Sequence, residues 1–274
     1  MSPTAFIVGA GGHLGLAIAN KLKHEGYKVA VGSRKPLQKE GLVPIIVDVS
    51  NTDSITKAFA EVKEKLGAAP NVVIFNGSSV RPCPPSKRLI HPFSFSSSVA
   101  AFALPELPGD PSSVALSAVK DSADITVGLY ASIQEAVAGF RTLPADASVP
   151  KSFIFTGNRL PFLPRDAPWS NLLSLGLQKV GGAYLAEIFH TAYEKEGFRY
   201  DFRSLSVGLS VLLTRRSRSS GRFYFGDENK PDGSPANADW SDTAHATAYW
   251  DAISRKERGS WYLRFDADGK PLPQ

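Results

Sequence analysis

Glycines gather in one short segment of the sequence, where they would let the backbone approach a phosphate group. The segment reads Val8-Gly9-Ala10-Gly11-Gly12-His13-Leu14-Gly15, and it follows the apolar run Phe6-Ile7-Val8. Residues 16–22 then have the apolar spacing of a helix. Because helix N-termini and side-chain-free loops favour a pyrophosphate, this strand, turn and helix predict a dinucleotide site. The residues expected to contact the cofactor here are Gly9, Gly11, Gly12, His13 and Leu14, with His13 over the phosphates.

The residues expected at the adenosine ribose indicate which dinucleotide binds. Such folds place the group that contacts this ribose about 20 residues beyond the glycines. Here the second predicted strand ends Gly32-Ser33-Arg34-Lys35, without the acid that would accept the 2′-hydroxyl of NAD. A guanidinium and a hydroxyl suit a 2′-phosphate, so we expect NADP(H), contacted by Ser33, Arg34 and Lys35. The alternative is that Arg34 is an ordinary exposed basic residue.

Strands and helices alternate along the chain that positions these groups. Further strands are predicted at 28–32, 43–47, 71–75, 152–155, 200–207 and 261–265, and further helices at 54–66, 113–140 and 172–196. This alternation predicts a Rossmann-type α/β fold, a doubly wound parallel sheet with helices on both faces. We expect one NADP(H)-binding domain over residues 1–274. Its substrate site would lie in the loops after the fourth, fifth and sixth strands, with an insertion at 209–240 that is either an irregular lid or a surface loop.

Composition narrows the class of protein. With 274 residues, 43% of them hydrophobic, the chain can bury one substantial core. The single cysteine, Cys83, excludes a disulfide framework, and the sequence has neither a signal segment nor a membrane-length apolar run. We therefore expect a cytoplasmic protein without a membrane partner.

Charge and histidine spacing exclude two further classes of partner. The net charge is +5, and the basic cluster at 215–222 lies among serines and glycines, which indicates a solvated loop and no nucleic-acid partner. The five histidines show no metal-ligand spacing, so no metal is expected. They are His13, His24, His91, His190 and His245.

The order of these motifs resembles the short-chain dehydrogenase/reductase family along most of the chain. The glycine segment is similar to the family's TGxxxGxG, with His13 in place of the middle glycine. The other resemblances are Asp48-Val49 to the adenine-contacting Asp-Val, Asn76-Gly77-Ser78 to Asn-Asn-Ala-Gly, Lys179 to the lysine of Tyr-x-x-x-Lys, and Val207-Gly208 to the Pro-Gly beside the nicotinamide. The resemblance implies that these residues contact the cofactor of a hydride-transferring enzyme.

The family's proton donor is missing from this chain. In the family, a tyrosine four residues before the lysine protonates the carbonyl oxygen as hydride reaches carbon, but Leu175 stands there. The family's serine would fall at 156–158 and its asparagine near Ile125, and neither is present, although Lys179 can still hold the ribose. Two conclusions stay open. The protein is a non-catalytic NADP(H) sensor, or its substrate needs no proton, as with an iminium ion that hydride turns into a neutral amine.

A predicted loop after the fifth strand carries a carboxylate and an aromatic ring. It reads Arg165-Asp166-Ala167-Pro168-Trp169, so Asp166 could pair with a cationic nitrogen and Trp169 could stack on it. The alternative is that Asp166 pairs with Arg165 or caps a turn, and that Trp169 packs within the loop.

This Asp-x-x-Trp loop, combined with the lost tyrosine, resembles the reductase/Diels–Alderases of fungal prenylated indole alkaloid biosynthesis, of the malbrancheamide and paraherquamide type. The resemblance implies an NADP(H)-dependent redox step on an iminium or diketopiperazine substrate, followed by an intramolecular Diels–Alder cyclisation to a bicyclic diazaoctane. Asp166, Trp169 and Lys179 would then be catalytic. In that group an arginine of the long helix assists the site, whereas this helix has Ala131 there.

An ordinary NADPH-dependent ketone, enone or imine reductase is the alternative enzyme. It would need a substitute proton donor, such as Tyr184 or water. An apolar cavity would suit either reaction, and the residues that could line it, or pack in the core, are Phe93, Phe95, Phe102, Phe162, Leu163 and Leu209. The resemblance also allows a homo-oligomer paired through the long helices.

Overall fold

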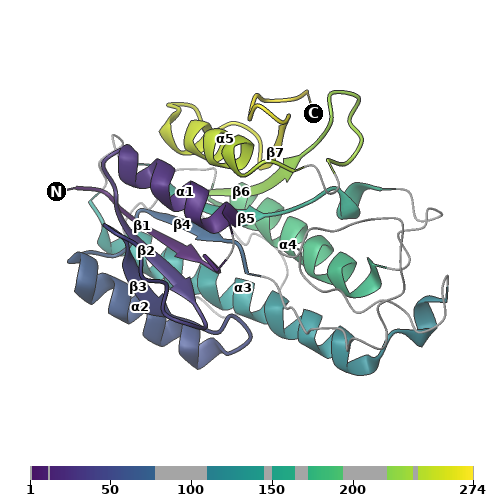
Figure 1. Ribbon diagram of the computed structural model, residues 1–274, viewed down its shortest axis with the longest axis horizontal. Helices are drawn as coiled ribbons and strands as arrows, with labels where there is room; N and C mark the ends of the chain where they lie inside the picture. The colour runs from purple at the N-terminus through teal and green to yellow at the C-terminus, as the bar shows by residue number, and fades with distance from the viewer. Residues whose placement is uncertain are drawn as a thin grey trace, which may run out of the picture.

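The structure is a computed structural model that describes residues 2–11, 13–77, 110–144, 150–163, 172–193, 221–236 and 240–273. Within these ranges, seven parallel strands form one sheet in the order β3-β2-β1-β4-β5-β6-β7 (Figure 1). The strands are β1 (Thr4–Val8), β2 (Lys28–Ser33), β3 (Val43–Ile46), β4 (Val72–Phe75), β5 (Lys151–Thr156), β6 (Gly221–Glu228) and β7 (Tyr262–Phe265). The predicted α/β fold with a parallel sheet is therefore confirmed.

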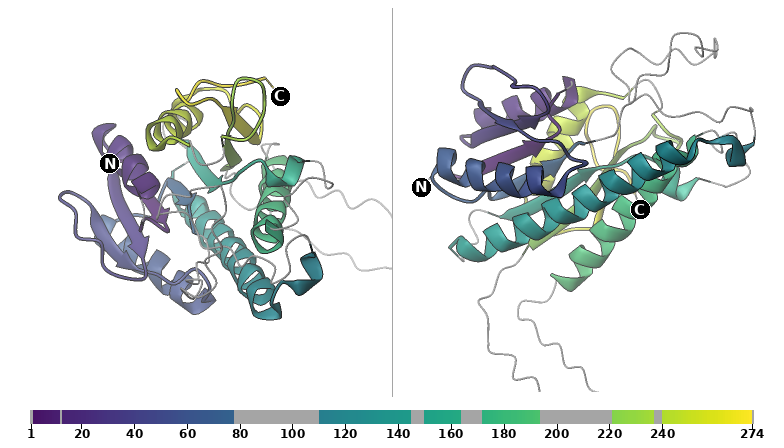
Figure 2. Two further views of the ribbon diagram at one scale, coloured as in Figure 1. Left: turned by 45° about the vertical axis from the view of Figure 1, so that its right-hand side comes forward. Right: turned by 90° about the horizontal axis from the view of Figure 1, so that it is seen from below.

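Helices cover both faces of this sheet, as the two views in Figure 2 show. Helices α1 (His13–His24) and α5 (Asp242–Ser254) pack together on one face. Helices α2 (Thr52–Leu66), α3 (Leu116–Thr142) and α4 (Leu173–Ala192) cover the other, where two short 3-10 turns, Pro111–Ser113 and Leu160–Phe162, flank them. In the described part of the chain, no helix combines the length and the apolar character needed to span a bilayer.

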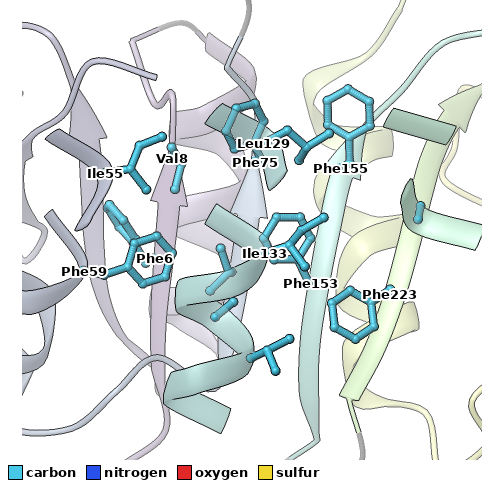
Figure 3. Close-up of a cluster of buried hydrophobic side chains, with 14 of the residues drawn as sticks. Phe6, Val8, Ile55, Phe59, Phe75, Leu129, Ile133, Phe153, Phe155 and Phe223 are labelled. Carbon is cyan, nitrogen blue, oxygen red and sulfur yellow. The ribbon is translucent and has the colours of Figure 1, made fainter. Parts of the chain in front are cut away.

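Side chains alternate between the two faces and so build two cores. On β1, Phe6 and Val8 join the core under α2, α3 and α4, whereas Ala5 and Ile7 join the core under α1 and α5. Figure 3 shows the first core, in which phenylalanines from several strands meet Leu129 of α3. Because both faces are covered, the strands are nearly continuous apolar runs.

The position of β6 corrects the sequence analysis. The strand occupies Gly221–Glu228, inside the stretch 209–240 that was expected to be an insertion, while the predicted strand at 200–207 lies outside the described residues. Three aromatic residues, Phe223 to Phe225, are buried between the helical layers, but polar residues on both sides hid this run. Arg222 is likewise not in a solvated loop, because its guanidinium donates to the carbonyl groups of Arg255 (2.7 Å) and Lys256 (2.9 Å).

One close approach fixes α3 against the segment that follows β3. Helix α3 crosses the segment that follows β3 at Gly128, where an added Cβ would lie 1.8 Å from the carbonyl oxygen of Val49. Only glycine allows the helix to pass this close. The contact holds Val49, a predicted cofactor residue, at the carboxyl ends of the strands.

Candidate active site

The glycine loop after β1 is pressed between the ends of β2 and β4. Its amides at Gly9 and Ala10 donate to the carbonyl oxygen of Gly32, at 2.9 and 2.8 Å. Gly9 has a φ of 86°, and an added Cβ would lie 2.6 Å from the backbone nitrogen of Gly77. Conformation and space therefore both require glycine here. The backbone then enters α1 at the exposed His13, with Leu14 buried behind it.

Several predicted cofactor residues meet around this loop. The side-chain amide of Asn76, just after β4, donates to the carbonyl oxygen of Gly9 at 3.2 Å. An added Cβ on Gly77 would lie 3.0 Å from Val49, and one on Gly11 would lie 4.0 Å from the Cβ of Ser33. The structure thus brings residues from four separate segments to one edge of the sheet, and it leaves a side-chain-free strip of backbone beside them.

Basic residues lie exposed at the end of β2. Arg34 and Lys35 are exposed, and the hydroxyl of Ser33 donates to the carbonyl oxygen of Lys35. Asp48 accepts from the hydroxyl and the amide of Ser50, at 2.7 and 3.0 Å. These bonds, helped by the charge of Arg34, hold the pKa of Asp48 below its ordinary value. Both bonds from Ser50 go to Oδ1 of Asp48, and the Arg34 guanidinium remains exposed near this carboxylate.

Lys179 lies at the carboxyl end of β5. Its Nζ donates to the carbonyl oxygen of Thr156 at 2.6 Å and lies 4.7 Å from the ring centroid of Phe155. The side chain is buried, and the loss of water lowers the pKa of its ammonium group to about 8, against the opposing effect of the Asp227 charge. One turn earlier on α4, Leu175 is buried, so no phenol stands at that position.

A second group of polar side chains near Lys179 was not identified from the sequence. The hydroxyl of Tyr262 on β7 donates to Asp227 Oδ2 on β6 at 2.6 Å, and the guanidinium of Arg159 donates to that hydroxyl oxygen at 2.8 Å. Asp227 is 1% exposed, and burial raises its pKa although the bond from Tyr262 acts against this. Burial also raises the pKa of Tyr262, as does the neighbouring carboxylate. The available signal was a carboxylate two residues after an aromatic run, but this stretch lies within the insertion that the sequence analysis expects at 209–240.

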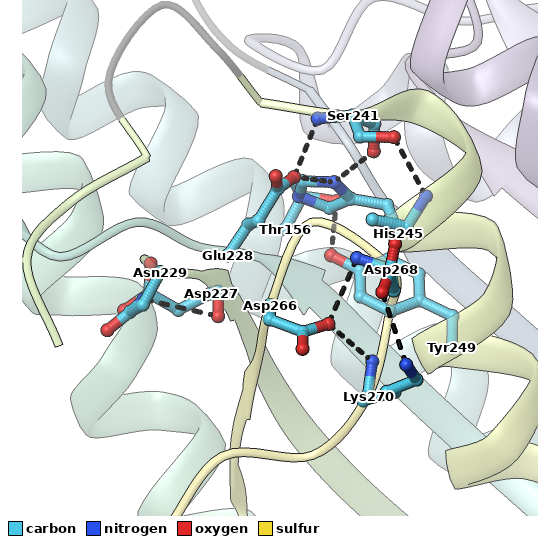
Figure 4. Close-up of polar contacts among 11 residues, drawn as sticks. Thr156, Asp227, Glu228, Asn229, Ser241, His245, Tyr249, Asp266, Asp268 and Lys270 are labelled. Atoms are coloured by element: carbon cyan, nitrogen blue, oxygen red, sulfur yellow. Dashed lines mark hydrogen bonds and ion pairs between the residues drawn. The ribbon is translucent and has the colours of Figure 1, made fainter. Parts of the chain in front are cut away.

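A hydrogen-bonded cluster on the other face joins α5 to the ends of β5 and β6 (Figure 4). Glu228 accepts from the amide of Ser241 at 2.7 Å and lies 3.1 Å from Nδ1 of His245. Tyr249 donates to the hydroxyl of Thr156 at 3.2 Å. These contacts place α5 and hold Thr156 from behind, so the backbone that receives the Lys179 ammonium is held from both faces.

Other predicted site residues are placed differently or are not described. Tyr184 is 64% exposed and lines an apolar surface groove with Val127 and Tyr130, so this candidate donor faces outward from α4. The ring of Phe162 lies 4.3 Å from that of Tyr262, which puts this candidate lining residue beside the Asp227 group. The residues that lie outside the described ranges are Gly12, Ser78, Cys83, Phe93, Phe95, Phe102, Asp166, Trp169, Val207, Gly208 and Leu209.

Comparison with known proteins gives one relative along nearly the whole chain. The chain is 29% identical over 266 residues to the short-chain dehydrogenase/reductase dmxR12 of Cryptosporiopsis sp. (strain 8999), which covers 96% of this chain and 92% of that protein. No protein-family model matches the chain.

Solved structures share the fold at low identity. A short-chain dehydrogenase from Burkholderia cenocepacia J2315 in complex with NADP matches with a TM-score of 0.60 and 14% identity, over 96% of this chain and 87% of that one. A 3-ketoacyl-(acyl-carrier-protein) reductase from Brucella melitensis complexed with NADH gives the same TM-score and identity, over 97% of both chains. The fungal relative, which is similar along nearly the whole chain, and the sheet shared with solved structures support assignment of the chain to the short-chain dehydrogenase/reductase superfamily.

Proposed function

We propose that this oxidoreductase uses NADP(H) to reduce an iminium ion in an indole alkaloid intermediate of the diketopiperazine type. In this proposal the same pocket then guides the Diels–Alder cyclisation of the product. The observation that carries the cofactor assignment is the edge of the sheet around Gly9, where glycine backbone lies near the end of β2 and the guanidinium of Arg34 is exposed. The structural neighbours do not decide it, since one holds NADP and the other NADH.

The described residues fit the proposed cofactor. Gly9 and Gly11 would let the backbone reach the pyrophosphate, and the start of α1 at His13 and Leu14 would offer its free amides. Ser33, Arg34 and Lys35 would bind the 2′-phosphate, Asp48 and Val49 the adenine, and Asn76, Gly77 and Lys179 the nicotinamide half. NADPH would supply the hydride. The chain's own contribution is to hold and orient it.

The missing phenol supports an iminium substrate. Hydride addition to the carbon of C=N⁺ moves the π electron pair onto nitrogen and gives a neutral amine, so no proton donor is required. Leu175 at the tyrosine position suits this reaction. Asp166 would pair with the cation and Trp169 would stack on the indole, as the resemblance to the alkaloid enzymes implies. Cyclisation would then need only one near-attack pose of diene and alkene.

One experiment tests cofactor and substrate together. Purified protein is given a prenylated, tryptophan-derived diketopiperazine iminium with NADPH or NADH, and the products are followed by mass spectrometry. We expect reduction and a cyclised isomer of the reduced product, with kcat/KM at least about tenfold higher for NADPH. In Arg34→Glu, kcat/KM should fall more than about tenfold with NADPH, a loss above 1.4 kcal/mol, and change little with NADH.

Lys39→Glu is the matched control, because Lys39 is also exposed and lies a few residues after the proposed phosphate contacts. It should leave the cofactor preference intact. Equal losses with both cofactors in Arg34→Glu would contradict the 2′-phosphate assignment. Tight NADPH binding without turnover would instead favour the sensor.

A further inference from the structure

The ammonium group of Lys179 lies at the edge of the sheet where folds of this type bind their ligands. Lys179 lies one helical turn after Leu175 on α4, and its Nζ reaches the end of β5, where it donates to the carbonyl oxygen of Thr156 at 2.6 Å. An ammonium group carries three N–H donors. The described residues use one of them in this bond, so the group has donors left for a ligand at the carboxyl ends of the strands.

One charged group acts on Lys179 among the described residues, and it favours the protonated form of the lysine. On β6, the carboxyl group of Asp227 is the charge that acts on the ammonium group, and it supports the protonated state. Tyr262 holds that carboxyl group at 2.6 Å, and Arg159 holds the tyrosine in turn at 2.8 Å. Helix α3 faces this turn of α4 with an uncharged residue, Ser122, which accepts from the amide of Gln178 at 3.3 Å.

We propose that Lys179 is the proton donor that replaces the missing tyrosine, and that the protein therefore also reduces neutral ketones. This inference rests on the proposed NADP(H) function. Hydride addition to the carbonyl carbon breaks the C=O π bond and moves its electron pair onto oxygen. That oxygen takes a proton from Nζ of Lys179, which leaves a neutral amine, and the amine regains a proton from water after the alcohol departs.

The acidity of the group suits this role. A general acid works best when its pKa lies near the operating pH, and burial lowers the pKa of Lys179 to about 8. Lys179 is then mostly protonated at neutral pH and still acidic enough to donate. Asp227 is a positioning residue. Its negative charge raises the pKa of the buried ammonium group, so without Asp227 the group would lose its proton at a lower pH.

The test compares two substrates that differ only in their need for a proton. Initial rates with NADPH are measured for an aryl ketone and for an aryl iminium ion, in the wild-type protein and in Lys179→Arg and Lys179→Met. We expect both variants to lose more than about 100-fold in kcat on the ketone. On the iminium ion, the loss in kcat at saturating NADPH should be at least about tenfold smaller than on the ketone. A weaker hold on the cofactor would lower both rates alike, whereas only the ketone needs the proton.

A pH profile separates the donor from a merely structural lysine. In the wild-type protein, kcat on the ketone should fall above a pKa near 8, whereas kcat on the iminium ion should not. Asp227→Asn removes the supporting negative charge, so its alkaline limb should move to lower pH. Lys151→Met is the matched control, since Lys151 is also a buried lysine with a lowered pKa but lies at the opposite end of β5. It should change neither the profile nor the ratio of the two rates.

The outcomes distinguish this inference from the function on which it rests. Iminium reduction without any ketone reduction in the wild-type protein would overturn the proton donor and leave the proposed function standing. Equal losses on both substrates in the Lys179 variants would show that the lysine holds the cofactor and donates no proton. A wild-type protein that binds no NADPH would overturn both.

Discussion

Position 9 needs glycine for two separate physical reasons, which makes it a sharp test of the cofactor site. Its φ of 86° is unfavourable for any L side chain, and an added Cβ would lie 2.6 Å from the nitrogen of Gly77. We expect Gly9→Ala to lower the free energy of unfolding by about 2–4 kcal/mol, the sum of the left-handed conformation and the overpacking. NADPH affinity should also fall more than tenfold by fluorescence titration.

Gly26 supplies the control for this substitution. It has the same φ of 86°, but an added Cβ would meet nothing within 4 Å. Gly26→Ala should therefore cost only the conformational part, about 1–2 kcal/mol in urea denaturation, and leave NADPH affinity unchanged. If the two variants bind NADPH equally well, the strip of backbone at Gly9 is not the pyrophosphate site.

Residues that are close in the sequence could be grouped into a candidate site from the sequence, whereas residues that meet only through the sheet could not. The glycine segment and Ser33-Arg34-Lys35 each follow directly from one strand, so their chemistry is visible in a few consecutive residues. Asp227 and Tyr262 are 35 positions apart, and they meet because β6 and β7 pair side by side. The spacing of neighbouring residues in the sequence does not indicate that these two strands pair.

At the scale of elements, the packing of α3 against the loop after β3 depends on one glycine. An added Cβ at Gly128 would lie 1.8 Å from the carbonyl oxygen of Val49. This clash cannot be relieved by a side-chain movement, because both groups belong to the backbone. We expect Gly128→Ala to destabilise the protein by about 1–3 kcal/mol or more, because the helix must move outward. The effect is measured by thermal or urea unfolding.

Gly176 on α4 should respond in the opposite direction. Nothing lies within 4 Å of a Cβ added there, and alanine is favoured over glycine inside a helix by roughly 0.5–1 kcal/mol. Gly176→Ala should therefore raise the free energy of unfolding. Stabilisation of Gly128→Ala to the same degree as Gly176→Ala would show that helix propensity, rather than the contact with Val49, governs position 128.

Helices α1 to α4 and most of the described strands were predictable because their periodicity is local, whereas α5 (Asp242–Ser254) was not predicted. The expected helix at 113–140 is found at Leu116–Thr142, and the one at 172–196 at Leu173–Ala192. Strand β6 was not predicted because a strand that is buried on both faces shows no alternation of polar and apolar residues. Its sequence has only a short aromatic run between polar neighbours. Whether such a run forms a strand depends on the strand that pairs with it, and that strand lies far away in the sequence.

For the whole molecule, buried lysines make stability depend on pH. Burial lowers the pKa of Lys179 to about 8 and also lowers that of Lys151, whereas both titrate near 10.4 in the unfolded chain. Between these values the unfolded state binds more protons, so stability rises with pH. From about pH 7 to 9.5, the free energy of unfolding should rise by about 2 kcal/mol more in the wild-type protein than in Lys179→Met.

Urea denaturation of the two proteins at both pH values measures this difference. The upper pH stays below 10 because burial raises the pKa values of Tyr249 and Tyr262, and stability contributed by these phenols is lost only at higher pH. Parallel pH dependence of wild type and variant would mean that Lys179 titrates normally in the folded protein, which would also weaken its assignment as a proton donor.

The strand order has a consequence for how the protein is made. Strand β1 lies inside the sheet, and β4, β5, β6 and β7 are added outward from it in the order of the chain. Each of these strands therefore leaves the ribosome when its partner has already emerged, and none has to insert between two others. The glycine loop has its β2 and β4 neighbours early, whereas Tyr262 arrives last. A nascent chain would thus complete the glycine loop before it acquires Tyr262, the residue that holds Asp227.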